Sequence, residues 1–258
     1  MASPIFSSAA KAKEPIMLDS ILGYIWMREH GHIKNTSEVR EENLIFPELP
    51  IKRTNKCYHA SALIFSKYTS SWQDRFTKRG LSELDFKNSM KTFVAGTNSA
   101  MKPGFVDYVG IATPTLTAYA DVTDIEEFKR LTNQILHFGI GAKTSVGFGR
   151  VKKIDYKSYP EDKIYELMID GRPTRALPVQ DFMKMNPKAA VGYATYYAPY
   201  WFAAHKAPCF LVDPEIIYPF NQPISDEEAD KLLDDVYLYL HPADADDSDE
   251  DDDDDDEE

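Results

Sequence analysis

The stretch LTAYADVTDIEEFKRLTNQILHFGIGAKTSVGFGRV, residues 116–151, decides the fold. Its first part, Leu116 to Asp121, has the pattern of an extended strand. Asp121 or Thr123 is expected to cap the helix that follows, because both side chains can accept a hydrogen bond from the first helical amides. From Ile125 to Phe138 the apolar residues recur with the period of an amphipathic helix. The sequence therefore predicts a strand that leads directly into a helix.

The predicted helix ends in a glycine-rich loop, GIGAKTSVGFGR, from Gly139 to Arg150. Glycine adopts positive φ and leaves the backbone accessible, so amide groups of such a loop can reach phosphate oxygens. The loop is neither a P-loop, since GxxxxGK[ST] is absent, nor a dinucleotide fingerprint, because it follows its helix instead of opening one. The alternative is a turn that only lets the helix pack against a following strand, predicted for Val146 to Tyr156.

The acidic charge of the chain is concentrated at its C-terminal end. The formal net charge is -13, and residues 243–258 alone hold 13 of the 42 acidic side chains. The rest of the chain has 29 acidic and 29 basic side chains, with six more bases than acids in residues 1–157 and six more acids than bases in residues 158–242. This asymmetry is typical of a nucleic-acid-binding part followed by a more acidic part. We expect the acidic tail to be disordered.

Cysteine content and hydropathy predict a cytoplasmic protein. The two cysteines, Cys57 and Cys209, are far apart and have no metal-ligand spacing, so neither a disulfide framework nor a zinc site is indicated. No apolar run has the length of a secretion signal core or of a membrane span, and we expect no membrane partner. Because hydrolase and metalloenzyme motifs are also absent, we predict no cofactor and no metal ion.

Basic and aromatic side chains alternate between Ile51 and Phe93. Cations neutralise phosphates while ring faces stack on unpaired bases, so this combination is typical of single-stranded RNA binding. The alternative is a solvated charged surface over a core to which the same rings contribute. The bases are Lys52, Arg53, Lys56, Lys67, Arg75, Lys78, Arg79, Lys87 and Lys91, and the rings are Tyr58, Phe65, Tyr68, Trp72 and Phe76.

Periodic patterns predict four further elements. A core-facing helix is expected to begin after Asp19 as its N-cap. An extended segment is expected over Tyr58–Phe65 and another strand over Ile164–Ile169. A last amphipathic helix is expected over Asp226–Leu240.

Several of these segments resemble the RAMP superfamily of CRISPR-associated proteins. GIGAKTSVGFGRV, residues 139–151, is similar to the superfamily's glycine-rich loop, and EPIMLDSILGYIW, residues 14–26, is similar to its opening strand and first helix. The span Tyr58 to Gly80 resembles a basic insertion that faces RNA. RPTRALPVQDF, residues 172–182, and YATYYAPYWF, residues 193–202, are most similar to the subunit that caps the 5′ handle of guide RNA in type IV complexes. The aromatic residues of the last segment are expected to form a packing surface or a subunit interface.

The resemblance extends over residues 17–220, and the acidic tail departs from it. It implies an α+β fold, the ferredoxin-like (RRM-related) RAMP fold with a glycine-rich loop and a basic insertion. Residues 1–157 would form the ferredoxin-like RNA-binding part, with the insertion at about 51–93. Residues 158–242 would form a second, more acidic part that packs on it. The implied partners are guide RNA, other effector-complex subunits and, indirectly, target DNA.

The function implied is non-catalytic binding of the crRNA 5′ handle within an antiviral ribonucleoprotein complex, and two alternatives stay open. A RAMP-type endoribonuclease that processes guide precursors would need a histidine as general base, and His30, His32 and His59 are the candidates. An acidic decoy that mimics nucleic acid, or a CRISPR inhibitor, would use the tail to occupy a partner's basic groove. Truncation at Ala243 distinguishes a decoy from an RNA binder, because a decoy loses its activity while an RNA binder shielded by the tail gains affinity.

We predict no catalytic residue. The residues expected to bind RNA lie in the basic stretch and in the glycine-rich loop. They are Lys52, Arg53, Lys56, Arg75, Lys78, Arg79, Gly139, Gly141, Lys143, Thr144, Ser145, Gly147, Gly149 and Arg150.

Overall fold

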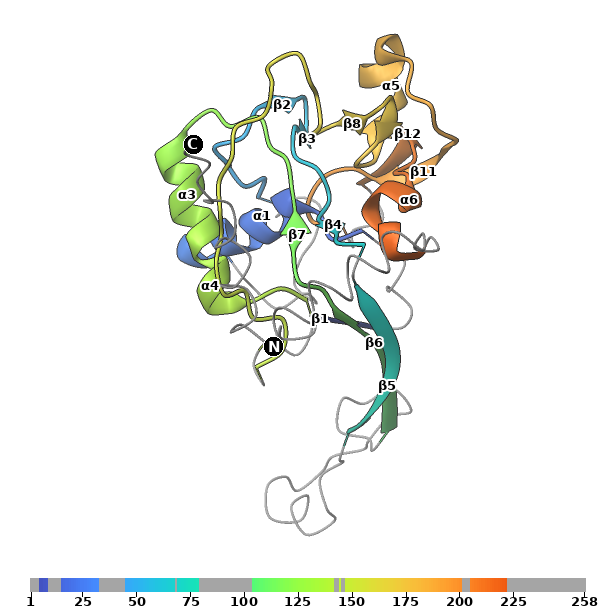
Figure 1. Cartoon of the computed structure of the whole chain (residues 1–258). Helices are drawn as coiled ribbons and strands as arrows, with labels where there is room; N and C mark the ends of the chain where they lie inside the picture. The colour runs from blue at the N-terminus through green and yellow to red at the C-terminus, as the bar shows by residue number, and fades with distance from the viewer. Residues whose placement is uncertain are drawn as a thin grey trace, which may run out of the picture.

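A computed structural model describes residues 5–8, 15–32, 45–67, 69–78, 104–141, 144, 147–200 and 205–221 (Figure 1). Helices and small antiparallel sheets alternate along the chain, which confirms the α+β class. The sheets in the described part of the chain have two or three strands each. The predicted helix at 226–240 and the acidic tail lie outside the described residues. No helix among those described is both long and apolar enough to cross a membrane.

The longest strands form a hairpin that extends away from the rest of the molecule (Figure 1). β5 (Ser70–Lys78) pairs antiparallel with β6 (Gly104–Ala112), from Ser70 opposite Ala112 to Lys78 opposite Gly104. β1 (Ile5–Ser8) adds to the other edge of β6. β5 belongs to the predicted basic insertion, so residues 70–78 of that insertion project from the body at one end (Figure 1).

The body is built on α1 (Leu18–Glu29) and on a set of very short strands. These are β2 (Arg53–Thr54), β3 (Cys57–Tyr58), β4 (Ile64–Phe65) and β7 (Leu116–Thr117). Isolated bridges from Ala60 to Ala120 and from Ile51 to Val122 continue the pairing between them. The predicted extended segment over Tyr58–Phe65 is therefore confirmed, although its partners change along its length.

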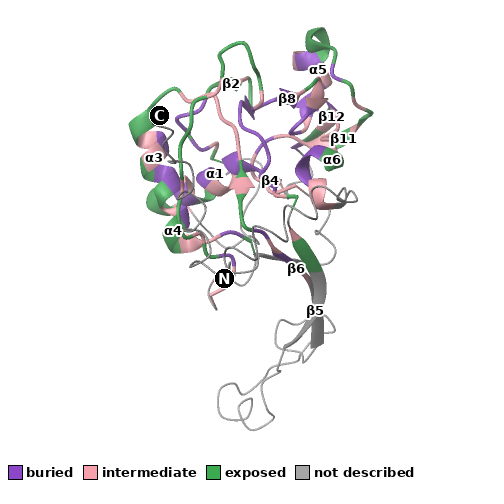
Figure 2. Ribbon diagram, viewed as in Figure 1, coloured by how far each residue is buried: buried purple, intermediate pink, exposed green. Residues whose placement is uncertain are grey.

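The main core lies between α1, the inner side of α3 (Ile125–Asn133) and these strands (Figure 2). Leu22, Ile25 and Leu131 are completely or almost completely buried in it. Burial of aliphatic side chains of this size stabilises a fold by about 1.5–3 kcal/mol each. Ile217 from α6 (Pro214–Ile217) belongs to the same cluster, so the core joins early and late segments of the chain.

The predicted helix at 125–138 is present, in two pieces, α3 and α4 (Ile135–Phe138). The predicted caps were wrong by one to three residues, because the N-cap is Asp124, whose carboxylate accepts from the amides of Glu126 and Glu127 at 3.1 Å. The strand predicted for Val146–Tyr156 was also wrong: residues 150–160 form no strand. Instead Val151 and Ile154 pack on the core as irregular chain.

The later part of the chain forms two small sheets. β8 (Met168–Ile169) pairs with β9 (Arg172–Pro173), so only the end of the strand predicted at 164–169 is regular. β10 (Leu177–Pro178), β12 (Lys206–Phe210) and β11 (Val191–Thr195) form a three-stranded sheet in that order. α5 (Val179–Phe182) and two short 3-10 helices, Met183–Met185 and Pro219–Asn221, complete this part.

The predicted N-cap role of Asp19 was wrong. Met17 is the N-cap of α1 and makes no side-chain cap, whereas Asp19 points into the interior and is 1% exposed. There the Tyr200 hydroxyl donates to its carboxylate, with the two oxygens at 2.8 and 2.9 Å, and the carboxylate pairs with Arg175. Arg175 is itself fully buried and also donates to the backbone oxygens of Ala60 and Tyr196. A buried charge of this kind must be paired and hydrogen-bonded, which this network achieves for both Nη atoms of Arg175.

The network gives the aromatic segment a packing role. Tyr196 and Tyr200 contact Arg175, and Tyr197 is 8% exposed and stacks with His205 at 3.8 Å. Tyr193 differs, since it is 77% exposed. The predicted packing surface is therefore present within the chain. Trp201 and Phe202, which belong to the same segment, lie outside the described residues.

Candidate functional site

The glycine-rich loop closes on itself directly after α4. Gly139 ends the helix at φ 72°, and the amide of Ile140 donates to the oxygen of Gly149 at 2.8 Å. Within the loop the amide of Gly147 donates to Thr144 at 3.0 Å. Gly141 also has positive φ, at 87°. Left-handed backbone at several positions is accessible to glycine at no steric cost, which explains this composition.

Two glycines of the loop have different reasons to be glycine. A Cβ on Gly149 would lie 1.9 Å from the oxygen of Ile140, so the close approach of the two loop ends excludes any other residue. A Cβ on Gly147 would meet nothing within 4 Å, and only its φ of 96° favours glycine there. Gly149 therefore serves packing, whereas Gly147 is favoured only by its backbone conformation.

A hollow of about 550 Å³ lies beside the loop. Arg150 and Lys152 are exposed at its rim, and neither forms an ion pair with any residue that the structure describes. Among the described residues, no acidic side chain lines the hollow. Its lining consists of Leu136, His137, Phe138, Gly139, Thr144, Phe148, Arg150, Val151 and Lys152. Lys143 and Ser145, which the sequence places in the same loop, lie outside the described residues.

The end of α1 adjoins this hollow. The Arg28 guanidinium lies 4.5 Å from the centre of the Phe138 ring, and Phe138 lines the hollow. His30 stacks on Trp26 at 4.1 Å between ring centres, and His32 lies 5.8 Å from the same indole. The Nδ1 atom of His30 is 2.8 Å from the backbone oxygen of Trp26. His30 is exposed, whereas Trp26 and His32 are half-buried. Aromatic rings beside cations are the groups that unpaired bases contact in RNA complexes.

The residues of the basic insertion that were predicted to bind RNA do not lie together at the hollow. Lys52, Arg53 and Lys56 lie on and around β2 and β3, at the end of the body opposite the projecting β5–β6 hairpin (Figure 1). Arg75 and Lys78 belong to β5, and Arg79 lies outside the described residues.

Each of the three bases around β2 and β3 already has a partner. Lys52 pairs with Asp121 at 3.0 Å. Arg53 lies over the Phe46 ring at 5.2 Å, and Lys56 lies over the Tyr197 ring at 4.9 Å.

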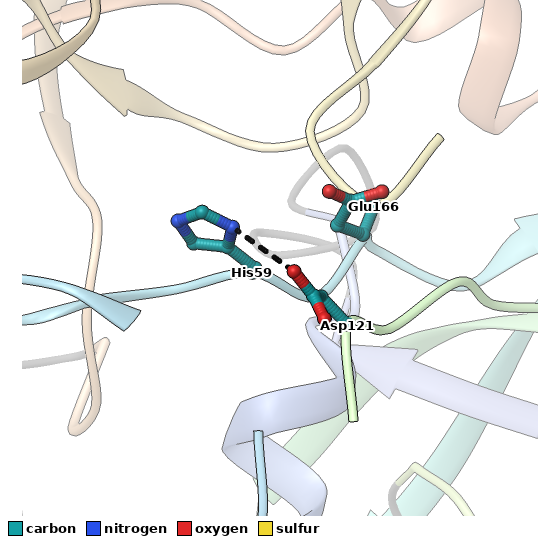
Figure 3. A group of neighbouring side chains, drawn as sticks. All are labelled: His59, Asp121 and Glu166. Carbon is teal, nitrogen blue, oxygen red and sulfur yellow. Dashed lines mark ion pairs between the residues drawn. The ribbon is translucent and has the colours of Figure 1, made fainter. Parts of the chain in front are cut away.

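A second constellation lies beside β3 and consists of His59, Asp121 and Glu166 (Figure 3). One ligand atom from each, a ring nitrogen and two carboxylate oxygens, lie within 4.8 Å of one another. The Nδ1 atom of His59 is 4.0 Å from Asp121 Oδ2. His59 and Glu166 are buried, whereas the Asp121 side chain is 37% exposed. The group is thus accessible from the side of Asp121.

The backbone fixes two members of this group. The amide of His59 donates to Lys52, that of Lys52 to Asp121, and that of Asp121 to His59, at 2.8 to 3.0 Å. This closed ring of hydrogen bonds places three side chains of different charge side by side. Glu166 reaches the group from a turn whose next residue, Leu167, accepts a hydrogen bond from the amide of Thr174 at 2.9 Å.

Two members also have a partner on their outer side. Thr54 Oγ1 lies 2.9 Å from His59 Nε2, and the Tyr159 hydroxyl donates to Glu166 at 2.8 Å. Burial raises the pKa of Glu166, while burial and the nearby Lys52 lower the pKa of His59. Both shifts favour the neutral forms of these buried groups.

Sequence reasoning singled out His59 as one of three candidate general bases and missed its two neighbours. Asp121 was considered as a helix cap, and Glu166 lay unremarked in a predicted strand. The three are separated by 62 and 45 residues, so no spacing rule could have linked them.

The chain matches no model of a known protein family. A search of curated proteins likewise finds no match.

Proposed function

We propose that this chain binds RNA without cleaving it, as the subunit of a CRISPR ribonucleoprotein complex that holds the 5′ handle of the guide RNA. The observation that carries the proposal is the hollow beside the glycine-rich loop, where Arg150 and Lys152 lie at the rim and no described acidic side chain offsets their charge. A phosphate is attracted to such a site, because its exposed cations are not offset by carboxylates among the described residues.

The sequence resemblance supplies the class of RNA in this proposal. The loop that resembles the RAMP glycine-rich loop is the one that borders the hollow. The stacked rings of Trp26, His30 and His32 offer surfaces for bases beside it. The proposal includes the ferredoxin-like, RRM-related fold, in which a basic insertion projects from the body.

The site is tested by a pair of charge reversals that change the net charge equally. Lys152 faces the hollow, whereas its neighbour Lys153 pairs with Asp155 at 2.8 Å. Fluorescence anisotropy with a labelled single-stranded RNA, over a series of salt concentrations, should show at least about tenfold weaker binding for Lys152→Glu. The slope of log affinity against log salt should become shallower by about one for each phosphate that the variant no longer neutralises. Lys153→Glu should bind almost as the unaltered chain does. Equal reductions in affinity for the two variants would show that the effect comes from long-range electrostatics. That result would contradict RNA binding at the hollow.

The class of RNA is tested separately. RNA that copurifies with the chain from its host is sequenced, and short guides with a common 5′ end are the expected result. Removal of that 5′ end from a synthetic guide should abolish the difference between Lys152→Glu and Lys153→Glu. Copurified RNA with no common end would contradict handle binding while leaving RNA binding intact. The predicted basic insertion is tested by Arg53→Glu, a charge reversal at the other end of the body, which should weaken binding if that end also contacts the RNA.

A further inference from the structure

We infer that His59, Asp121 and Glu166 form a binding site for a divalent transition-metal ion. The site is separate from the hollow, and the inference does not depend on the proposed RNA binding. One imidazole nitrogen and two carboxylate oxygens are ligands that suit ions such as Zn²⁺ and Mn²⁺.

The spacing of the ligand atoms suits an ion after a small closure. A bound ion holds such ligands at about 2.0–2.2 Å, which sets them roughly 3–4 Å from one another. The Nδ1 atom of His59 and Oδ2 of Asp121 are 4.0 Å apart, and the widest separation in the group is within 4.8 Å. Side-chain rotations that shorten these distances by at most about 1–2 Å complete the site.

The orientation of His59 is an independent argument for a ligand. Its side chain is 10% exposed, and its Nδ1 atom faces the two carboxylates without a hydrogen bond to any described residue (Figure 3). Its other nitrogen, Nε2, is held by Thr54. Metal-binding histidines usually have this arrangement, in which one nitrogen is fixed by an outer partner and the other is directed at the ion.

The carboxylates are held in the same manner. Tyr159 donates to one oxygen of Glu166 and leaves the other oxygen for an ion. Asp121 is held by Lys52, whose ammonium is 3.0 Å from Oδ2 and occupies part of the space that a dication would take. Since the Lys52 side chain is 59% exposed, it can turn out to solvent when the ion enters. Lys52 is therefore a competitor of the metal ion.

Because Lys52 competes with the ion, its removal should have the opposite effect on metal affinity to the removal of a ligand. The affinities of the full-length chain for Zn²⁺ and Mn²⁺ are measured by titration calorimetry, with Mg²⁺ as a comparison. We expect one site that prefers Zn²⁺ or Mn²⁺ to Mg²⁺. His59→Ala, Asp121→Asn and Glu166→Gln should each lower the affinity by at least about tenfold. Lys52→Met should raise it, because the rival cation is gone.

Controls separate this site from weak binding by the acidic C-terminal residues, which every variant retains. Asp155→Asn removes an equal charge from an exposed ion pair with Lys153 and should leave the affinity unchanged. Circular dichroism shows whether each variant is folded. If Glu166→Gln does not fold, Lys52→Met still tests the site, because its expected effect is a gain of affinity. The inference is overturned if the unaltered chain and Lys52→Met show no one-to-one binding step, or if His59→Ala binds as tightly as the unaltered chain.

Discussion

Arg175 and Asp19 form an ion pair in which both side chains are completely buried, with 3.4 Å between Nη2 and Oδ2. The guanidinium also donates to the backbone oxygens of Tyr58 and Ala60, on a segment more than a hundred residues earlier. The pair thereby attaches the segment around Arg175 to α1 and to β3. Loss of one partner would leave an uncompensated charge in the interior, which is far more costly than loss of an exposed pair.

Arg175→Met should therefore lower the free energy of unfolding by about 3–5 kcal/mol. Arg175→Lys should not restore it, because a single ammonium cannot replace the two Nη atoms that donate in different directions. Urea denaturation followed by circular dichroism measures both. The control is Arg172→Ala, whose exposed pairs with Asp213 and Glu215 should contribute less than about 1 kcal/mol. A loss for Arg175→Met no larger than that of the control would contradict the structural role of the pair.

Gly149→Ala should destabilise the loop much more than Gly147→Ala. The first substitution places a Cβ against the oxygen of Ile140, whereas the second introduces only the strain of positive φ. We expect roughly 2–4 kcal/mol for Gly149→Ala and about 1 kcal/mol for Gly147→Ala. Thermal and urea unfolding give the two values. Equal destabilisation would show that the two ends of the loop do not approach so closely.

Asp124→Ala should lower stability by about 1 kcal/mol, because two amides at the start of α3 lose their acceptor. Thr123→Ala is the matched control: Thr123 is one of the two caps that the sequence suggested, and the cap of α3 is the neighbouring Asp124 instead. We expect a change close to zero for the control in the same urea measurement. A larger loss of stability for Thr123→Ala than for Asp124→Ala would contradict Asp124 as the N-cap of the helix.

The chain should lose stability as the pH rises above about 9. Burial raises the pKa of Cys209 from about 9 to about 11, and burial also raises the pKa of Tyr200. Because both pKa values are raised on folding, the contribution is complete below the ordinary pKa of each group and is lost as the pH approaches the folded value. For the thiol the loss is on the order of 2 kcal/mol. Urea unfolding at a series of pH values measures it, and Cys209→Ala should flatten the decline between pH 9 and 11. An unchanged decline would assign it to the other groups whose pKa burial raises, namely Cys57 and the buried tyrosines.

Local sequence patterns predicted the helices of this chain better than their boundaries. The apolar residues of 125–138 recur with a helical period because one side of the helix packs against a single core. This pattern was correctly interpreted as helical. The cap was misplaced because the amide of Thr123 donates to Pro50 at 3.1 Å, and Val122 is bridged to Ile51. This pairing with a remote segment keeps the chain extended up to residue 123, so the helix begins only at Ile125.

The wrongly predicted strand at 146–156 and the site that was missed have the same physical cause. A strand needs an available neighbouring edge, and residues 150–160 have none among the described strands, although Val151 and Ile154 have strand-like character. The constellation of His59, Asp121 and Glu166 likewise exists only because three distant segments meet. Neither pairing partners nor such meetings can be read from local spacing.

The late position of α6 in the core has a consequence for synthesis of the protein. Tyr218 stacks on Phe65 with 5.5 Å between ring centres, and Ile217 is completely buried in the same cluster as Leu22. On the ribosome, Phe65 and Leu22 emerge long before the residues that cover them. The nascent chain therefore carries an incompletely covered apolar surface until α6 has been released, and this interval is when chaperone binding protects it most.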